Sequence, residues 1–431
     1  MTATPSAVAT PDLTCYRCGA TAAFPDRKRC ECGEPLWFDT DDAAADFSWP
    51  EQRAGPRSDA GRGVWRYADL LPVGPPGDTA EGTREPEPAG VAAAAGDTPL
   101  VRAAGLDADA GCRLWLKDET ANLTGSFKDR GSAVGAAWAA AAGREWLGTV
   151  SHGNMAVSVA ANAAGLGGDG PNALVLVPDD ISAERLAAID QYDPAVLRVA
   201  GDYGRLYYET LAADAPVAFV NSDTPLRVAG QKTTALEICE AFERDGAASA
   251  PDAIVLPVSS GGHASAVWKA LRELRAAGLL GEADLPRLYL VQAAACAPIA
   301  AAYREGADDV TAADETAETV AYSIANPDPP SETRALAAAR ETGGAVLSVP
   351  DDEIRDAKAS LAAEAGFCVE PASATALAGV RRLSDRGDLA ADDEVVAVLT
   401  GTGFRELSAG GEPPEAIGLD DLPERLRSLT G

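Results

Sequence analysis

The sequence predicts an α/β fold in which helices cover both faces of a parallel sheet. From residue 97 onward, short apolar runs alternate with helical patterns of roughly ten to twenty residues. Strands joined through helices of this length pair in parallel, because the crossover returns the chain to the same edge of the sheet. The length of 431 residues exceeds what one small core accommodates, so we expect about two or three domains.

The expected strands are short apolar runs that end in polar or glycine-containing turns. They are RLWLKD (113–118), WLGTVS (146–151), ALVLVP (173–178), VLRVAG (196–201), VAFVNS (217–222), AIVLPV (253–258), RLYLVQA (287–293), AVLSVP (345–350) and VVAVLTG (395–401). Helical patterns between them include 230–246 and 351–366. Ligands of parallel sheets bind at the carboxyl ends of the strands, so the turns after these runs are the expected place for chemistry.

Charge and hydropathy exclude two classes of partner. The chain has 66 acidic against 36 basic residues and a net charge of −30, whereas nucleic-acid binding needs a basic footprint. Such an acidic surface is typical of halophilic proteins, and we predict adaptation to salt. No apolar run approaches the roughly 18 residues of a membrane helix, and the first ten residues lack the features of a signal peptide. We therefore expect a cytoplasmic protein without a membrane partner.

Four of the eight cysteines form a C-x2-C-x11-C-x-C pattern, in which each pair is followed by glycine. Two thiolate pairs on tight turns can surround zinc tetrahedrally. Disulfides are the alternative, but a chain without a secretion signal is expected in a reducing compartment. Four thiolates leave no open position on the metal, so we predict a structural rather than a catalytic Zn²⁺. The predicted ligands are Cys15, Cys18, Cys30 and Cys32.

The first turn with candidate chemistry is NLTGSFKDRG, in which Lys128 opens a helix just after a Gly-Ser pair. The positive end of the helix dipole, about half a charge, lowers the pKa of a lysine there and makes its amine a nucleophile for aldehydes. The alternative is a surface lysine paired with Asp129.

The second turn is SHGNM, which contains Ser151 and Asn154 between an expected strand and an alanine-rich helix. The Asn154 amide can donate to a ring oxygen, while Ser151 and the N–H groups of the turn can hold a carboxylate. The alternative is an ordinary helix cap.

The third and fourth turns suit a phosphate and a ring nitrogen. PVSSGGHAS opens a helix with serines and glycines, whose N–H groups can form a phosphate cradle. It lacks the lysine and hydroxyl that end a mononucleotide-binding loop. In VLTGTGF, the hydroxyl of Thr400 can meet a heterocyclic nitrogen. Capping serines and a capping threonine are the alternatives. The cradle consists of Ser259, Ser260, Gly261, Gly262 and His263.

Together the four turns describe one ligand. Lys128 suits an aldehyde, Asn154 a ring oxygen, the serine–glycine cradle a phosphate and Thr400 a ring nitrogen. Pyridoxal 5'-phosphate carries all four groups and forms Schiff bases with lysine. We therefore predict this cofactor, with Phe127 beside the lysine as a further contact.

Several segments resemble threonine synthase, a family of fold-type-II pyridoxal-phosphate enzymes. The similar segments lie within roughly residues 63–406. They include NLTGSFKDRG, GNMAVSVAANAAG, FVNSDTPLRVAGQKT, VQAAACAPI, GFCVEPASATALAGV and LTGTGF. The resemblance implies a tryptophan-synthase-β-like fold with two open parallel-rich sheets covered by helices. The cysteine module is similar to the zinc-ribbon-like extension of archaeal and some bacterial members.

The expected organisation combines these observations. Residues 1–38 form the zinc-ribbon-like module, and 39–95 form a linker and N-terminal arm with one packed segment, GVWRYADLL, and a mobile loop. Residues 96–431 form the pyridoxal-phosphate-dependent catalytic region. The resemblance implies a smaller subdomain of about 135–225 inserted in the larger one.

The resemblance also implies a reaction in threonine biosynthesis. O-phospho-L-homoserine and water give L-threonine and phosphate by γ-elimination and β-addition, and Lys128 moves the protons at Cα and Cβ. Asn221, Ser222 and Arg227 match the positions that the family uses for the substrate's phosphate, and the Arg227 fork suits a dianion. The alternative for Arg227 is a salt bridge to a surface acid.

The chain departs from the family pattern at several positions. Leu123 stands where the family usually has Pro, Met155 where it has Thr, and Ala229 where it has an acidic residue. Ser260 and His263 stand where the cradle usually has Asn. Two alternatives stay open: another fold-type-II lyase acting by β-elimination or β-replacement on serine, threonine or a sulfur amino acid, and a non-catalytic zinc-ribbon binding protein. The oligomeric state is also open, with a homodimer as one option.

Overall fold

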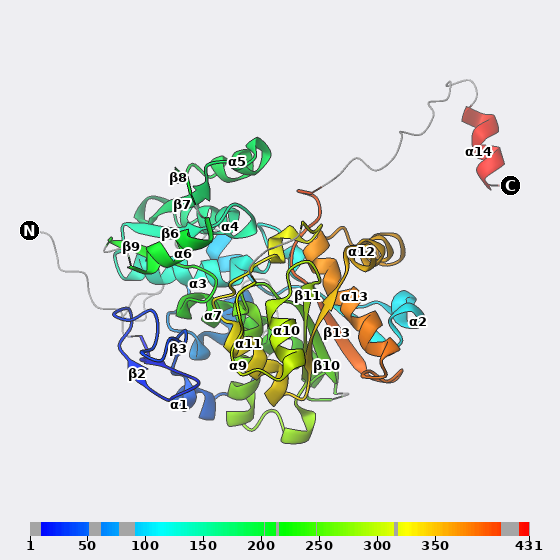
Figure 1. Ribbon diagram of the computed structural model, residues 1–431, viewed down its shortest axis with the longest axis horizontal. Helices are drawn as coiled ribbons and strands as arrows, with labels where there is room; N and C mark the ends of the chain where they lie inside the picture. The colour runs from blue at the N-terminus through cyan, green and yellow to red at the C-terminus, as the bar shows by residue number, and fades with distance from the viewer. Residues whose placement is uncertain are drawn as a thin grey trace, which may run out of the picture.

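In the computed structural model, the chain forms two parallel-rich sheets covered by helices and a small antiparallel sheet near the N-terminus (Figure 1). This arrangement confirms the predicted fold class. The structure describes residues 10–50, 62–76, 91–201, 203–212, 215–246, 248–313, 318–406 and 422–430.

The small sheet contains three two-residue strands in the order β2-β1-β3, all antiparallel. Its aromatic residues bury it against the catalytic region, since Trp37 packs on Trp268 and Phe24 on Trp138. The module is therefore attached to the rest of the chain through its apolar core. The elements are β1 (Leu13–Thr14), β2 (Thr21–Ala22), β3 (Trp37–Phe38) and the following helix α1 (Asp41–Ala45).

The predicted arm contains a packed segment, as expected. The 3₁₀ segment η1 (Gly63–Leu70) buries Trp65 and Tyr67, and the Tyr67 hydroxyl donates to Glu240 at 2.6 Å. Most of the predicted mobile loop, residues 77–90, lies outside the described residues. We keep the division into module, arm and catalytic region as a proposal.

The larger parallel sheet has six strands in the order β12-β11-β10-β13-β5-β4, and only β4 runs antiparallel to its neighbour. Adjacent residues of one strand face opposite cores, as a doubly covered sheet requires. In β10, Ile254 faces the core formed with α8 and α9, while Val255 faces the core formed with α12 and α13. The strands are β4 (Leu100–Arg102), β5 (Arg113–Asp118), β10 (Ala253–Pro257), β11 (Arg287–Ala293), β12 (Ala345–Val349) and β13 (Glu394–Leu399).

Helices join and cover these strands. They are α2 (Asp107–Ala110), α3 (Lys128–Ala141), α7 (Pro225–Gln231), α8 (Thr233–Asp245), α9 (Gly262–Ala276), α10 (Pro298–Glu305), α11 (Glu332–Glu341), α12 (Asp351–Ala365) and α13 (Pro371–Asp385). A further helix, α14 (Leu422–Thr430), follows near the C-terminus. Among the helices of the described ranges, none is long and apolar enough to cross a membrane.

The second parallel sheet has four strands in the order β8-β7-β6-β9 and lies with its helices at one end of the molecule (Figure 1). All nine expected strands are present, including the four of this sheet. Its elements fall within the proposed subdomain of about 135–225. They are β6 (Trp146–Val150), α4 (Asn154–Ala164), β7 (Asn172–Pro178), α5 (Ala183–Asp190), β8 (Ala195–Val199), α6 (Tyr203–Ala212) and β9 (Val217–Phe219).

Helices α3 and α7 meet at glycines. A Cβ on Gly230 of α7 would overlap the carbonyl oxygen of Arg130 in α3, and a Cβ on Gly131 would lie 2.6 Å from the Arg227 side chain. The contact holds the helix that begins at Lys128 against the helix that contains Arg227. Two of the predicted site residues are therefore placed by backbone contact.

A buried ionic network fixes the same end of α3. Arg130 pairs with Glu119 and Glu237, each at 2.7 Å, and Lys117 pairs with Glu237 at 2.7 Å. The pairing keeps the pKa of the Glu237 carboxyl below its usual value, since the cations Arg130 and Lys117 outweigh its burial. Removal of one member would leave an uncompensated buried charge.

Replacing Gly230 with Ala should destabilise the protein by about 1–3 kcal/mol, because the added methyl group must push α7 away from α3. Thermal and urea unfolding of the two variants Gly230→Ala and Gly168→Ala measure this. Gly168 is exposed and a Cβ there meets no atom within 4 Å, so it serves as the matched control. Equal stability of the two variants would contradict the close approach.

Candidate active site

A cavity of about 1120 Å³ lies at the carboxyl ends of β6, β10 and β13, where the sequence placed the chemistry. Its wall includes the turn after β6, the serine–glycine turn after β10, and Thr400 after β13. Lys128 at the start of α3 completes it. The two parallel sheets thus contribute to one cavity.

Lys128 is the first residue of α3, and its Nζ lies 4.2 Å from the centroid of the Phe127 ring. Burial, with a smaller contribution from Arg227, lowers the pKa of this amine to about 7, while Glu370 opposes the shift. Pairing with Asp129 does not occupy it, because the Asp129 carboxylate accepts hydrogen bonds from Thr124 and Ser158. A large fraction of the lysine is therefore a neutral nucleophile near neutral pH.

Phe127 and His263 form a stacked pair beside the lysine, with ring centroids 4.2 Å apart and planes 17° from parallel. The His263 ring also lies 3.1 Å from the Thr234 hydroxyl through Nε2. Burial lowers the pKa of His263 well below its usual value, so the imidazole is neutral. The ring of His263 therefore supports Phe127, and its Nδ1 has no hydrogen-bond partner among the described residues. The backbone N–H of His263 can contribute to the predicted cradle.

Asn154 is the first residue of α4, and its amide is held on both sides. Its Nδ2 donates to Glu370 Oε2 at 2.8 Å, and its Oδ1 accepts from Arg405 Nη1 at 3.0 Å. These contacts fix which end of the amide is the donor and leave one Nδ2 hydrogen for a ligand. Burial, together with the charge of Glu406, raises the pKa of Glu370 to about 7, while Asn154, Lys128 and Arg405 oppose the shift.

The serine–glycine cradle is closed from behind by two carbonyl groups. Gly261 has φ +81°, and a Cβ there would lie 2.5 Å from the Ser331 oxygen. A Cβ on Gly262 would overlap the Ser222 oxygen. Only glycine fits at both positions, and α9 begins there with its N–H groups directed out of the helix end. A phosphate is the ligand that this end suits best.

Thr400 is buried at the end of β13, where its hydroxyl lies 3.0 Å from the hydroxyl of Ser373. Ser373 also accepts from the backbone N–H of Gly401 at 2.8 Å. Thr400 lines the cavity, and its hydroxyl is of the kind that can donate to, or accept from, a ring nitrogen.

The residues predicted to hold the substrate are not all on the cavity wall. Ser151 and Ser222 line the cavity. Asn221 instead holds the end of β6, because its Oδ1 accepts from the Val150 N–H at 3.0 Å and its Nδ2 donates to Thr210 at 3.0 Å. Both ends of its amide are thus engaged within the protein.

Arg227 is completely buried between α3 and Gln231, and only Gln231 of the two residues lines the cavity. With the Gln231 amide turned so that its oxygen faces the guanidinium, it accepts from Nε at 3.1 Å and from Nη2 at 2.5 Å. Its Nη1 has no hydrogen-bond partner among the described residues. Burial lowers the pKa of Arg227 to about 9, while Asp129 and Asp223 oppose the shift. Contact with the substrate's phosphate stays a prediction.

Three residues of the cavity were not predicted from the sequence. They are Glu370, Arg405 and Tyr322. Glu370 occupies the N-cap position of α13, directly before Pro371, but its side chain makes no capping hydrogen bond. Polar residues at helix starts usually serve as caps, so only the fold shows that this carboxylate contacts Asn154. Arg405 reaches the cavity from the turn after β13, and Tyr322 reaches it from the short 3₁₀ helix η7 (Tyr322–Ile324). Neither gives a periodic signal in the sequence.

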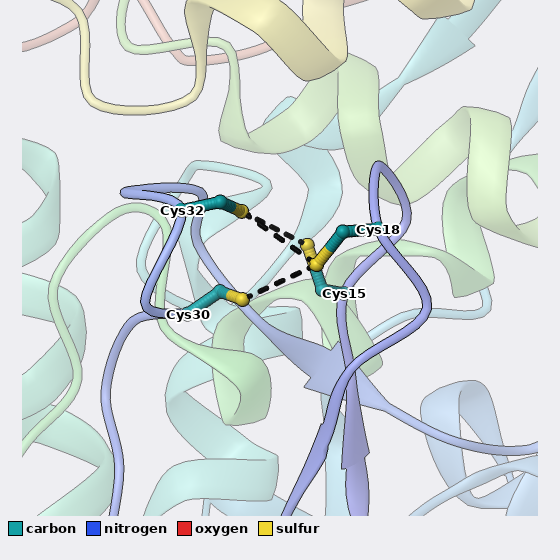
Figure 2. A group of neighbouring side chains, drawn as sticks. All are labelled: Cys15, Cys18, Cys30 and Cys32. Carbon is teal, nitrogen blue, oxygen red and sulfur yellow. Dashed lines mark hydrogen bonds between the residues drawn. The ribbon is translucent and has the colours of Figure 1, made fainter.

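The four predicted metal ligands converge in the small module (Figure 2). Their sulfur atoms all lie within 4.8 Å of one another, and none forms a disulfide. Two tight turns bring the pairs together, as Cys15 and Cys18 flank one and Cys30 and Cys32 the other. A tetrahedral Zn²⁺ fits four thiolates at this spacing.

The fold and the lysine-containing cavity define a pyridoxal-phosphate-dependent enzyme of fold type II. A family model described as pyridoxal-phosphate dependent enzyme matches residues 91–401. Among solved structures, maize serine racemase is 20% identical with a TM-score of 0.58 and covers 77% of this chain and 92% of its own. The L-serine ammonia-lyase of Rhizomucor miehei is 21% identical with a TM-score of 0.58 and covers 77% and 97%. Both show the shared fold.

Curated relatives narrow the class. The threonine synthase of Methanocaldococcus jannaschii is 34% identical over 417 residues, 96% of each chain. That of Methanosarcina acetivorans is 36% identical over 341 residues, 78% of this chain and 79% of its own. The chain belongs to the threonine synthase family.

The lowered pKa of Lys128 predicts how the apoprotein recovers its cofactor. Only the neutral amine attacks an aldehyde, so the rate of recombination with pyridoxal 5'-phosphate should rise with pH around a midpoint of about 7 rather than 10.5. Stopped-flow absorbance measures this rate between about pH 5.5 and 9, a range that extends to both sides of the expected midpoint. Lys128→Ala should form no borohydride-trapped adduct, whereas Lys358→Ala, remote from the cavity, should behave as wild type. A midpoint above about 9 would contradict the lysine's burial.

The raised pKa of Glu370 predicts a pH-dependent gain in stability for Glu370→Gln. Below pH 4.5 the carboxyl is protonated both folded and unfolded, and above about 7 the folded protein carries the full cost of a buried charge. The apoprotein variant should therefore gain about 1–3 kcal/mol relative to wild type above pH 7 and nothing near pH 4. Urea unfolding across this range measures it. Exposed Glu364→Gln is the control, and a pH-independent difference would contradict the assignment.

Proposed function

We propose that the protein is a threonine synthase that converts O-phospho-L-homoserine and water to L-threonine and phosphate by γ-elimination and β-addition. Similarity to the Methanocaldococcus jannaschii threonine synthase along 96% of both chains carries this proposal. The cavity's donor set supports it, since an amine, an amide, a hydroxyl and a backbone cradle match the groups of pyridoxal 5'-phosphate. When bound, this cofactor withdraws electrons from the substrate's Cα.

Lys128 is the proton carrier in this proposal. Its amine has a pKa of about 7, so it can accept a proton at Cα and return one at Cβ without a large energetic mismatch at either step. Its position at the start of α3 holds the amine within the cavity throughout. Phe127, packed between the lysine and the neutral His263 ring, limits the amine's movement.

The other cavity residues would bind and orient the cofactor. Asn154, fixed by Glu370 and Arg405, would donate its remaining N–H to the ring oxygen of the cofactor. Thr400 and Ser373 form a hydroxyl pair suited to the ring nitrogen. The N–H groups of the cradle at the start of α9 would hold the cofactor's phosphate.

The substrate's phosphate requires a second anion site. Ser151 and Ser222 line the cavity, and the buried Arg227 contacts the lining residue Gln231, with its Nη1 unpaired among the described residues. A dianion above Gln231 would be stabilised by this buried guanidinium even before direct contact, because charges interact strongly at low dielectric. A rotation of Gln231 would allow the direct contact.

A structural Zn²⁺ in the cysteine module and adaptation to salt are further parts of the proposal. The clustered sulfurs support the first, and the net charge of −30 supports the second. We also propose a location in the cytoplasm, where a biosynthetic enzyme meets its substrate.

The deciding experiment measures phosphate release and threonine formation from O-phospho-L-homoserine, with serine and threonine as rival substrates. Wild type should favour the phosphate ester by more than about 100-fold in kcat/KM, since loss of a paired buried charge costs about 3 kcal/mol or more. Arg227→Gln should remove most of that preference and leave the cofactor's absorbance intact. Turnover of serine or threonine at a comparable kcat/KM would instead identify a β-eliminating lyase.

A further inference from the structure

One arginine of the cysteine module reaches the back of the active site. Arg29 directly precedes the predicted metal ligand Cys30, and its Nη2 donates to Asp223 Oδ2 at 2.9 Å and to the Pro330 carbonyl oxygen at 2.9 Å. These acceptors are 194 and 301 residues away in the sequence. They belong to two segments that each contribute to the cavity wall, through Ser222 and Pro330.

Each of the two segments supports one glycine of the cradle. Asp223 follows Ser222, whose carbonyl oxygen packs on Gly262, and Pro330 precedes Ser331, whose carbonyl oxygen packs on Gly261. A single guanidinium therefore joins the two backbone segments that enclose the cradle from behind. Displacement of either segment would change where the cradle's N–H groups point.

Asp223 also contacts residues other than Arg29. Its carboxylate is buried and also accepts from the Tyr207 hydroxyl at 2.5 Å, and Tyr207 lines the cavity. Its backbone oxygen accepts from Arg334 at 3.3 Å. Because Ser222 and Asp223 are adjacent, the contacts of Asp223 also fix the segment predicted to bind the substrate's phosphate.

The module determines where Arg29 lies. Its Nη1 donates to the Gly33 carbonyl oxygen at 2.8 Å, across the turn that contains Cys30 and Cys32. The neighbouring Lys28 donates to two carbonyl groups at the end of α6, each at 3.0 Å. A metal bound by the four cysteines would fix this turn to β1, since metal binding stabilises the fold of such small modules.

We propose that Arg29 is a positioning residue that links the metal module to substrate binding. The bound metal fixes the turn of Cys30 and Cys32, the turn fixes Arg29, and Arg29 fixes Ser222–Asp223 and Pro330–Ser331 around the cradle. The inference rests on the proposed function for the identity of the substrate. It assigns the module a role in affinity for phosphate-bearing ligands, beyond stabilising the fold.

The first test separates KM from kcat. Arg29→Ala should raise the KM for O-phospho-L-homoserine about tenfold and change kcat less than about twofold, because Lys128 is untouched. Asp223→Asn removes the other partner and should act in the same direction. The control is Arg27→Ala in the same module, whose exposed pair with Glu31 makes no contact with the cavity. Unchanged KM in both Arg29→Ala and Asp223→Asn would overturn the proposal.

The second test needs no substrate. Hydrogen exchange of the Thr224 and Ser331 amides, which hydrogen-bond to Asn221 and Ser260, reports on the two segments directly. Exchange should accelerate in Arg29→Ala and in metal-depleted wild type, and not in Arg27→Ala. Metal depletion of Arg29→Ala should add no further acceleration, since the link is already broken. Unchanged exchange in metal-depleted wild type would refute the role of the metal.

These results also separate the inference from the proposed function. If wild type fails to convert O-phospho-L-homoserine, the proposed function is wrong, while hydrogen exchange and calorimetric binding of inorganic phosphate still decide the link through Arg29. If Arg29→Ala does not fold, Arg29→Lys retains the charge and one donor and should show a smaller rise in KM than Asp223→Asn. A general loss of thermal stability with KM unchanged would leave Arg29 a structural contact and refute the positioning role.

Discussion

Buried positive charge is the constraint on which the active site depends. Lys128 and Arg227 lie within electrostatic reach of each other in the interior, and burial together with their mutual repulsion lowers the pKa of the lysine. The buried Arg130, by contrast, is compensated by two carboxylates, since it is paired with Glu119 and Glu237. The chain has 66 acidic residues, yet Lys128 and Arg227 form no salt bridge among the described residues. An anionic ligand that binds in the cavity would compensate this buried positive charge. A phosphorylated cofactor and a phosphorylated substrate are such anions.

This constraint explains why the backbone around the site is so closely packed. Because no carboxylate pairs with these cations, the packing of the surrounding backbone must fix their positions. Glycines at the contacts of α3 with α7, and of α9 with its neighbours, allow the main chain to approach closely. The surrounding polar groups, such as the Asn154 amide between Glu370 and Arg405, are then fixed by hydrogen bonds. The preorganised donors need little rearrangement when charge develops in the ligand.

Much of the fold and part of the site could be predicted from the sequence because their signals are local. The strands are contiguous apolar runs, Lys128 and Asn154 open helices directly after strands, and the four cysteines have the spacing of a metal site. The burial of Arg227 and the orientation of the His263 ring could not be predicted, since both depend on which helices pack together. The contacts of Arg29 with Asp223 and Pro330 bridge 194 and 301 residues, and no pattern within a single segment encodes them.

The scarcity of histidine in this chain has a practical consequence for spectroscopy. Only two histidines are present, and both His152 and His263 line the same cavity. The imidazole region of a proton or nitrogen NMR spectrum would therefore contain reporters from the active site alone, without assignment of the remaining chain. One of these rings stacks on Phe127 and the other lies in the turn before α4, so the two signals would sense different walls of the cavity.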